Sequence, residues 1–286
     1  GVGLGFGAAR AKVWTFRATI LKRALFLMVI GLINALIFPA DILHYYAVYF
    51  VFGVFLIALP TKVLVVVGLF LPFLFVGLTD IFDYDIGWNW VTFDYSGFWS
   101  VEGFVRNLMY NGWHPVVPWL SFLVLGMLIA RMDLYGARNH NRLIVGGAVA
   151  LGLAYALSAF FTPFLVGEEV MLASVSPMPP FPLYMMAGAG AASLVIGLCL
   201  KLVRGEPNAW VMPFIATGKQ ALTLYIVHII LGMGVLEILG LIEGQSAEIS
   251  IFASGLFILF ALIYAVIWAR FFKTGPFEGL MRRIAG

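Results

Sequence analysis

Apolar residues occur along this chain in long, nearly uninterrupted runs, separated by short segments rich in proline, glycine and charge. A helix needs about 20 apolar residues to cross a bilayer, whereas barrel strands are shorter and alternate apolar with polar positions. The pattern therefore predicts an all-α, polytopic transmembrane helix bundle with eight spans, at about residues 22–38, 42–59, 62–78, 112–130, 143–161, 183–203, 219–240 and 249–270.

The composition supports this class. Of the 286 residues, 63% are hydrophobic and 11% are charged, which is outside the range of soluble proteins. Eight spans leave little room for a soluble domain, so we expect one transmembrane domain over residues 1–286. The first residues have neither the basic region nor the cleavage site of a signal peptide, so we expect a truncated start.

Charge is distributed unequally between the two sides of the predicted bundle. One side carries sixteen of the 17 Lys and Arg residues, and the other carries eleven of the 14 Asp and Glu residues. By the positive-inside rule the basic side is cytoplasmic, so both ends of this chain are expected in the cytoplasm. The net charge of +3 thus reflects membrane topology and does not indicate nucleic-acid binding.

A carboxylate and a histidine open the second run on the acidic side. Asp41 and His44 are three residues apart, which places them on neighbouring helical positions. Such a pair suits a histidine base oriented by a carboxylate, but it also suits a simple helix cap and anchor. Asn34, in the preceding run, is expected to form hydrogen bonds between helices.

The segment 111–119 places a histidine between two tryptophans at the start of the fourth run. One glycine and two prolines keep its backbone irregular, and membranes tolerate such backbone only where protein or a wet cavity covers it. His114 is then expected to face a cavity, with Asn111 as an amide donor. Alternatively, Trp113 and Trp119 are interfacial anchors, and water or a carbonyl satisfies His114.

Polar residues of the seventh run follow helical spacing. Gln220, Thr223 and His228 share a face, with Tyr225 beside them. A polar seam of this kind either holds helices together by hydrogen bonds or lines a path from the cytoplasmic face.

Other segments give weaker signals. His140 lies in a basic loop and is expected to be solvated. The predicted outer loop 79–103 interleaves acids with aromatic residues, which suits stacking on a sugar or polyol but is also common at membrane interfaces. The glycine-rich residues 1–7 resemble a close-packed helix end. No histidine pair has ligand spacing, so we expect no metal site.

Several short motifs occur in an order that resembles a known family. Together they resemble bacterial membrane proteins of the YeiB-type family of unknown function, which is similar to heparan-alpha-glucosaminide N-acetyltransferase-like and acyltransferase-3-like membrane enzymes. The motifs, which span most of the chain, are 40–46 (ADILHYY), 110–119 (YNGWHPVVPW), Gly126-Met127 with Arg131, 218–225 (GKQALTLY) with His228, and 275–278 (GPFE) with Arg282.

The resemblance implies a larger protein of about ten helices in the bacterial cytoplasmic (inner) membrane. The first helix and most of the second would then be missing here, with residues 1–7 as the tail of the second. The related acetyltransferases carry an essential histidine after their first helix, so part of the site would be missing as well.

The resemblance also implies acyl transfer from a cytoplasmic acyl-CoA, most simply acetyl-CoA, to an extracytoplasmic hydroxyl or amine of a glycan, polyol or lipid. The site would combine a base or acyl-accepting histidine, donors to the oxyanion or substrate, and cations for the CoA phosphates. The candidates are His114, His228 and His44 with Asp41 for the first role, Asn111, Gln220, Tyr225 and Trp113 for the second, and Lys219, Arg131 and Arg270 for the third.

Two other functions fit the same residues. The seam and the expected cavity suit a transporter of a small solute or acyl-bearing lipid, because glycine and proline breaks are also usual in transporters. A membrane scaffold without a pocket is the third alternative, and it requires packing alone to satisfy His114 and His228. Nothing in the sequence indicates an oligomeric state.

Overall fold

The structure is a computed structural model that describes residues 1–10, 13–203, 205–206, 208–242 and 244–286. The chain forms two compact units, Gly1–Leu202 and Val203–Gly286, and each is considered by itself. The sequence predicts a single domain, and this stays a prediction. Three of the charges behind the predicted orientation, Lys12, Arg204 and Glu243, lie outside the described residues.

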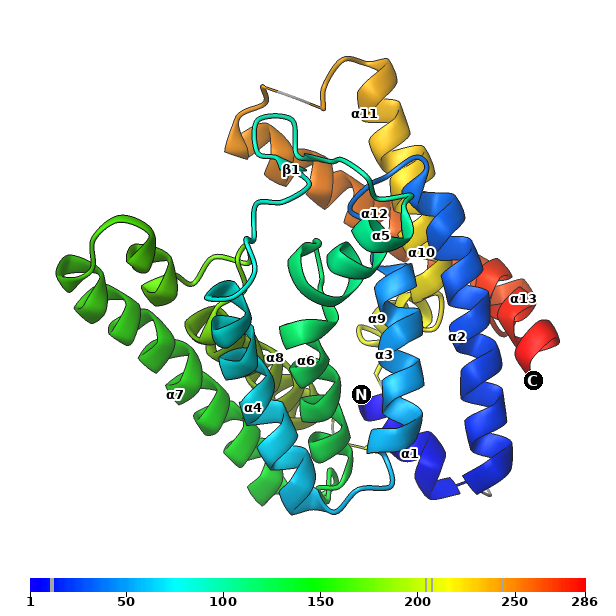
Figure 1. Cartoon of the computed structure of the whole chain (residues 1–286). Helices are drawn as coiled ribbons and strands as arrows, with labels where there is room; N and C mark the ends of the chain where they lie inside the picture. Colours follow the sequence, from blue (N-terminus) through cyan, green and yellow to red (C-terminus); the bar gives the residue numbers. More distant parts are fainter. Residues whose placement is uncertain (11–12, 204, 207, 243) are drawn as a thin grey trace. The chain divides into compact units, whose positions relative to one another are not determined.

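The first unit is helical apart from one short hairpin (Figure 1). In the hairpin, β1 pairs with β2 in antiparallel register, Trp88 opposite Tyr95. The elements are α1 (Val2–Arg10), α2 (Val13–Ala35), α3 (Leu43–Leu56), α4 (Thr61–Thr79), β1 (Trp88–Asn89), β2 (Asp94–Tyr95), α5 (Val101–Arg106), the π-helix η1 (Asn107–Asn111), α6 (Val116–Ala130), α7 (Ala137–Phe161), the 3-10 helices η2 (Thr162–Phe164) and η3 (Gly167–Ala173), and α8 (Pro182–Leu202).

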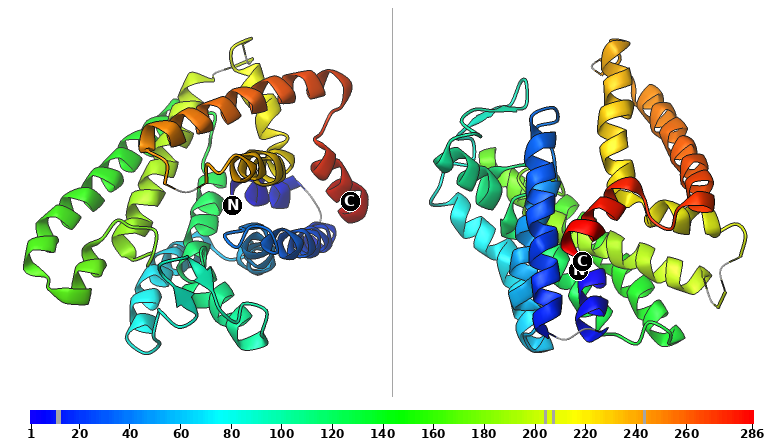
Figure 2. Two further views of the ribbon diagram at one scale, coloured as in Figure 1. Left: turned by 90° about the horizontal axis from the view of Figure 1, so that it is seen from above. Right: turned by 90° about the vertical axis from the view of Figure 1, so that its right-hand side faces the viewer.

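The second unit is made of helices throughout its described part. Two of them, α10 and the π-helix η4, continue into α11 as one rod (Figure 2). The elements are α9 (Met212–Gly218), α10 (Ala221–Val227), η4 (His228–Met233), α11 (Gly234–Ile238), α12 (Ala247–Phe271) and α13 (Pro276–Ala285).

All eight apolar runs are helical, which confirms the all-α class. Within the described residues, five helical stretches are long and apolar enough to cross a membrane, and a sixth exists if the pair 101–111 and 116–130, bent by 50°, counts as one span. The second predicted span is not among them. The helix α3 has only 14 residues, because the chain turns toward Pro60 soon after Leu56.

The core of the first unit lies where α2, α3, α4 and α6 meet. Figure 1 shows α2 and α3 running side by side, and α4 packs against α6. Leu64, Val124 and Met127 are fully buried there, together with Tyr45 and Tyr49 of α3. The two tyrosines bring hydroxyl groups into this apolar core, and these hydroxyls contribute to the site described below.

Glycines set the closest helix contacts. A Cβ atom on Gly1 would lie 2.7 Å from the Cα of Gly126, and one on Gly5 would lie 2.3 Å from the Cβ of Ala130, so the chain start packs tightly on α6, as expected. On α7, a Cβ on Gly147 would lie 2.6 Å from the carbonyl oxygen of Gly190 on α8. Small residues let membrane helices approach closely enough for dispersion contacts to hold them together.

Replacing Gly147 by alanine should therefore separate α7 from α8. We expect the Gly147→Ala protein to lose about 1–3 kcal/mol of stability through overpacking, measured as a lower Tm in detergent. Gly152→Ala on the same helix is the matched control, because a Cβ there meets nothing within 4 Å. Equal melting temperatures for the two variants would contradict the close contact.

Candidate functional site

The Asp41 carboxylate is fully buried immediately before α3. Its Oδ2 accepts hydrogen bonds from the backbone N–H groups of Leu43 at 2.8 Å and His44 at 3.3 Å, and it lies 3.0 Å from Nδ1 of His44. Its Oδ1 accepts a 2.7 Å hydrogen bond from Nδ2 of Asn34 on α2. Asp41 thus both caps the first turn of α3 and orients the imidazole, so the two sequence interpretations describe one arrangement.

A glycine on α2 makes room for this pair. A Cβ atom on Gly31 would lie 2.4 Å from the backbone nitrogen of His44 and 2.9 Å from Oδ2 of Asp41. Only glycine permits this approach of α2 to the start of α3. The approach also brings Asn34, one helical turn further along α2, within reach of the carboxylate.

The His44 side chain is fully buried among aromatic rings. The centroids of the Tyr45, Phe98 and Phe104 rings lie 4.1, 5.7 and 6.2 Å from its own. Asp41 beside Nδ1 favours the tautomer that carries its proton there, which leaves the lone pair on Nε2. Nε2 has no hydrogen-bond partner among the described residues. A carboxylate that orients an imidazole whose other nitrogen has no hydrogen-bond partner is the arrangement of a general base.

The irregular segment before α6 is tied to α3 by two tyrosines. The Tyr45 hydroxyl donates to Oδ1 of Asn107 at 2.5 Å and accepts from the backbone N–H of Trp113 at 3.2 Å. The Tyr49 hydroxyl donates to the carbonyl oxygen of His114 at 2.5 Å. A Cβ on Gly112 would lie 2.2 Å from the Tyr45 hydroxyl, so this position requires glycine.

These contacts bring His114 beside the Asp41–His44 pair. Its ring centroid lies 5.7 Å from that of Tyr45, the neighbour of His44 on α3, and 4.7 Å from that of Trp119. Nδ1 of His114 is buried and has no partner in the part of the chain that the structure describes. Two of the expected site segments, the start of α3 and residues 111–114, therefore meet.

Asn111 is fully buried and holds the outer loop in place. Its Nδ2 donates to the carbonyl oxygens of Tyr84 and Ile86, both at 2.8 Å, and its Oδ1 accepts from the Tyr95 hydroxyl at 2.8 Å. Both amide N–H groups are thus engaged, so the geometry favours a positioning residue over the oxyanion donor that the sequence suggested. Trp113 packs edge-on against Trp88, with ring centroids 5.3 Å apart.

The polar seam of the second unit is occupied by contacts between helices. Gln220 is buried, and its Nε2 donates to the carbonyl oxygens of Ala265 on α12 at 3.0 Å and Ala216 at 3.2 Å. The His228 ring lies 5.9 Å from both Tyr225 and Phe257, at the start of the π-helix η4. Of the two interpretations of the seam, these contacts fit hydrogen bonding between helices.

Thr223 and Glu278 cap each other's helices. The Glu278 carboxylate accepts from the backbone N–H groups of Leu222 and Thr223, at 2.7 and 3.1 Å, at the start of α10. The Thr223 hydroxyl donates to the same carboxylate at 2.5 Å and accepts from the backbone N–H of Phe277, at 3.1 Å, at the start of α13. A Cβ on Gly275 would lie 2.2 Å from the carboxylate. The motif at 275–278 is thus explained by capping across 55 residues.

The three candidate cations differ in their surroundings. Lys219 and Arg270, in the second unit, are exposed, as is Arg131 in the first. The Arg131 guanidinium, however, donates to the carbonyl oxygens of Ile57 and Leu59, at 3.0 and 2.8 Å, and so holds the turn between α3 and α4. No group of three or more His, Cys, Asp or Glu side chains within the described residues could hold a metal ion.

The expectation for His140 was wrong. It is 4% exposed on the first turn of α7, and its Nε2 lies 2.7 Å from the carbonyl oxygen of Leu134. The basic loop folds back so that a main-chain group meets the ring, which residue composition alone does not reveal.

A family of proteins of unknown function, DUF418, matches residues 129–286, more than half of the chain. The chain belongs to this family. The match confirms the family resemblance. It does not show a relation to acyltransferases. The matched DUF418 segment contains the Thr223–Glu278 caps, whereas Asp41, His44 and His114 precede it. No curated protein and no solved structure matches the chain.

Removing the Asn111 amide should release the outer loop. In an Asn111→Ala protein the carbonyls of Tyr84 and Ile86 lose their donors, at a cost of about 1–3 kcal/mol for the unsatisfied buried groups. Hydrogen exchange over residues 84–95 should accelerate by about one to two orders of magnitude. Asn139→Ala, which removes a half-buried amide of α7 that does not contact the outer loop, should leave that exchange unchanged. Unchanged exchange in Asn111→Ala would refute the anchoring role.

The reciprocal caps should stabilise the second unit. Glu278→Ala removes the acceptor for two main-chain N–H groups and one hydroxyl, so we expect a loss of about 1–2 kcal/mol and faster exchange of the Leu222 and Thr223 amides. Glu237→Ala, which removes an exposed acid of the same unit, is the control. If both variants melt and exchange alike, Glu278 does not cap α10.

Proposed function

We propose that this protein is an acyltransferase of the bacterial cytoplasmic membrane, which moves an acyl group from a cytoplasmic acyl-CoA to an extracytoplasmic hydroxyl or amine. The supporting observation is the buried Asp41–His44 pair, in which a carboxylate 3.0 Å from Nδ1 orients an imidazole whose Nε2 has no partner among the described residues. A scaffold has no use for an oriented, unsatisfied imidazole, because each buried unpaired group costs about 1–3 kcal/mol.

In this reaction His44 is the general base. Its Nε2 takes the proton from the acceptor hydroxyl or amine as the acceptor oxygen or nitrogen attacks the thioester carbonyl carbon. The new C–O or C–N bond forms, the C–S bond breaks, and the CoA thiolate leaves with the proton returned from Nε2. Asp41 stabilises the imidazolium that exists between these two proton transfers.

The other candidates take supporting roles. His114, with its buried and unpartnered Nδ1, is placed to bind the acceptor or the acyl group beside His44. Trp113 and Asn111 position that segment. The assignment of the CoA phosphates to the exposed cations Lys219, Arg270 and Arg131 stays a prediction from the charge distribution, which puts these residues on the cytoplasmic side. Gln220, Tyr225 and His228 then contribute to packing of the second unit.

Transport is the second candidate function, and one observation favours it. The helices 101–111 and 116–130 are bent by 50° at the break that contains His114, as in the discontinuous helices that form transporter binding sites. A transporter would bind its solute at the same cluster without breaking a bond. Consumption of acyl-CoA therefore distinguishes the two functions, because only an acyltransferase consumes it.

The test is acyl transfer by the purified protein in proteoliposomes with radiolabelled acetyl-CoA. We expect labelled acceptor or free CoA to form, and His44→Gln to lower kcat by about 10²–10⁴-fold, the usual contribution of a general base. Asp41→Asn should lower kcat less and shift the pH dependence of kcat. His140→Gln is the control for loss of a buried histidine.

Two results would overturn this proposal. One is full activity in a His44→Gln protein that melts like the wild type. The other is a folded wild-type protein that consumes no acyl-CoA while its vesicles take up solute or exchange labelled lipid, which would establish transport.

A further inference from the structure

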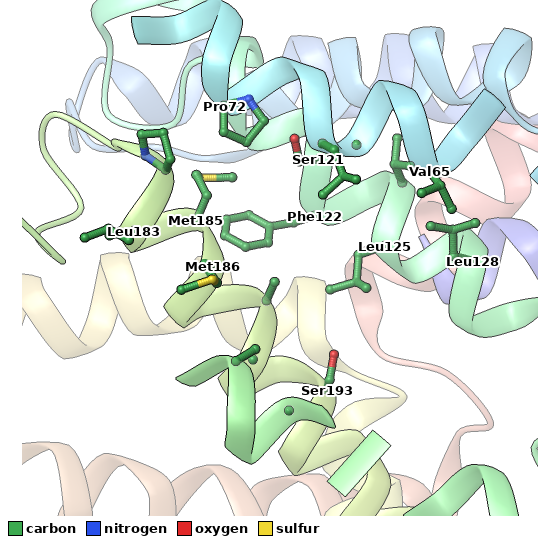
Figure 3. A pocket seen from close by; sticks show the side chains of 18 of the residues that line it. Val65, Pro72, Ser121, Phe122, Leu125, Leu128, Leu183, Met185, Met186 and Ser193 are labelled. Atoms are coloured by element: carbon green, nitrogen blue, oxygen red, sulfur yellow. The ribbon is translucent and has the colours of Figure 1, made fainter. Parts of the chain in front are cut away.

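A cavity of about 640 Å³ lies in the first unit, where α4 and α6 face α7 and α8 (Figure 3). Its volume is within the ~300–1,000 Å³ range of small-molecule sites. No charged side chain lines it among the described residues, and its polar lining side chains there are Ser121 and Ser193. A polar ligand in such a site would lose its hydrogen bonds to water without replacement, so the lining selects an aliphatic occupant.

One end of the cavity adjoins the polar cluster. Phe122 lines the cavity and points from α6 toward Met185 and Met186 of α8 (Figure 3). The Phe122 ring lies 5.5 Å from Trp119, and Trp119 lies 4.7 Å from His114. Ring contacts of Trp119 therefore connect Phe122 on the cavity wall with His114.

Among the described residues, polar atoms without partners lie on the cavity wall, at Ser121, and on the two residues that ring contacts connect to the wall, Trp119 and His114. Nε1 of Trp119 and Oγ of Ser121 are buried and have no hydrogen-bond partner within the described chain, as is true of Nδ1 of His114. Hydrocarbon chains gain little by moving from lipid into an apolar protein cavity, because both surroundings are equally apolar. Selective binding then depends on polar groups at the end of the cavity, and these three atoms supply them.

We infer that the cavity holds the hydrocarbon chain of a membrane lipid whose head group lies at Ser121, Trp119 and His114. The start of α6 lies on the side that the charge distribution predicts to be extracytoplasmic, so the lipid belongs to that leaflet. The hydroxyl or amine of its head group is the acyl acceptor; this last step rests on the proposed function, whereas chain binding does not.

The chain site is tested by photolabelling. The protein is reconstituted into vesicles of phosphatidylethanolamine and phosphatidylglycerol with a trace of phosphatidylethanolamine that carries a diazirine midway along one acyl chain, then irradiated and digested for mass spectrometry. We expect labels on Phe122, Leu125 and Met186, in excess over the exposed residues of α12.

Matched variants on α7 separate cavity binding from general lipid contact. Gly146 lines the cavity and Gly152 does not, and a Cβ at either position meets nothing within 4 Å. Gly146→Leu should reduce labelling of the cavity residues about tenfold, which corresponds to ~1.4 kcal/mol of lost binding, and Gly152→Leu should leave it unchanged. Ala150→Phe, a second substitution on the cavity wall, should also reduce the labelling of the cavity residues.

Several outcomes overturn the inference. Labelling that is uniform over lipid-facing helices, or equal in Gly146→Leu and wild type, removes the chain site. If excess palmitoyl-CoA abolishes the labelling, the cavity binds the acyl chain of the acyl donor and not the chain of a membrane lipid. If the protein acylates a water-soluble sugar and not the lipid, the lipid is not the acceptor, although acyl transfer is supported. If the protein consumes no acyl-CoA, the proposed function fails, and photolabelling alone decides whether the cavity binds a lipid chain.

Discussion

Main-chain N–H and C=O groups that leave a helix inside a bilayer have no water to bind, so the protein itself must supply their partners. This requirement explains several of the buried polar side chains in the described residues. At the break before α6, tyrosine hydroxyls of α3 bond to the main chain of Trp113 and His114, and Asn111 bonds to two carbonyls of the outer loop. In the second unit, Glu278 accepts from the first turn of α10. The helix breaks therefore require the buried polar side chains as hydrogen-bond partners, and those side chains in turn require the free main-chain groups at the breaks.

Accounting for these bonds separates the residues available for chemistry from those that hold the fold. Buried side-chain atoms without a hydrogen-bond partner remain on several of the described residues, among them Tyr84, His140 and Gln220. Four such residues, His44, His114, Trp119 and Ser121, belong to α3, to α6 and to the segment before α6. Ring contacts connect the first three of these residues through Tyr45. Several unsatisfied groups in one place are a cost of about 1–3 kcal/mol each, which a bound substrate would offset. If the unsatisfied groups lay far apart in separate packing contacts, no single bound substrate could offset their free-energy cost.

The sequence predicted the helices well because apolar runs and turn residues are local signals. It also brought Asp41 and His44 together, since three residues on a helix are neighbours. It did not predict that Glu278 caps α10, because 55 or 56 residues separate the partners and only tertiary packing joins them. The role of Asn111 was misjudged for a similar reason: its partners are carbonyls more than 20 residues away, whose directions depend on the loop fold. His140 shows that a basic neighbourhood does not determine exposure.

The loss of Asn111 as an oxyanion donor moves that role to the main chain. No side chain of the described residues caps α6, whose first turn begins at Val116, two residues after His114. The first N–H groups of a helix have no partner within it, and they carry the positive end of its dipole. At α3 the corresponding groups are already bonded to Asp41. At α6 the backbone is not helical at Val117 and Pro118 has no N–H, so the main-chain donors near His114 are the N–H groups of Val116 and Val117. In the proposed acyl transfer, charge would develop on the carbonyl oxygen while the imidazole gains a proton. A main-chain donor near His114 would stabilise the first charge, as Asp41 would stabilise the second.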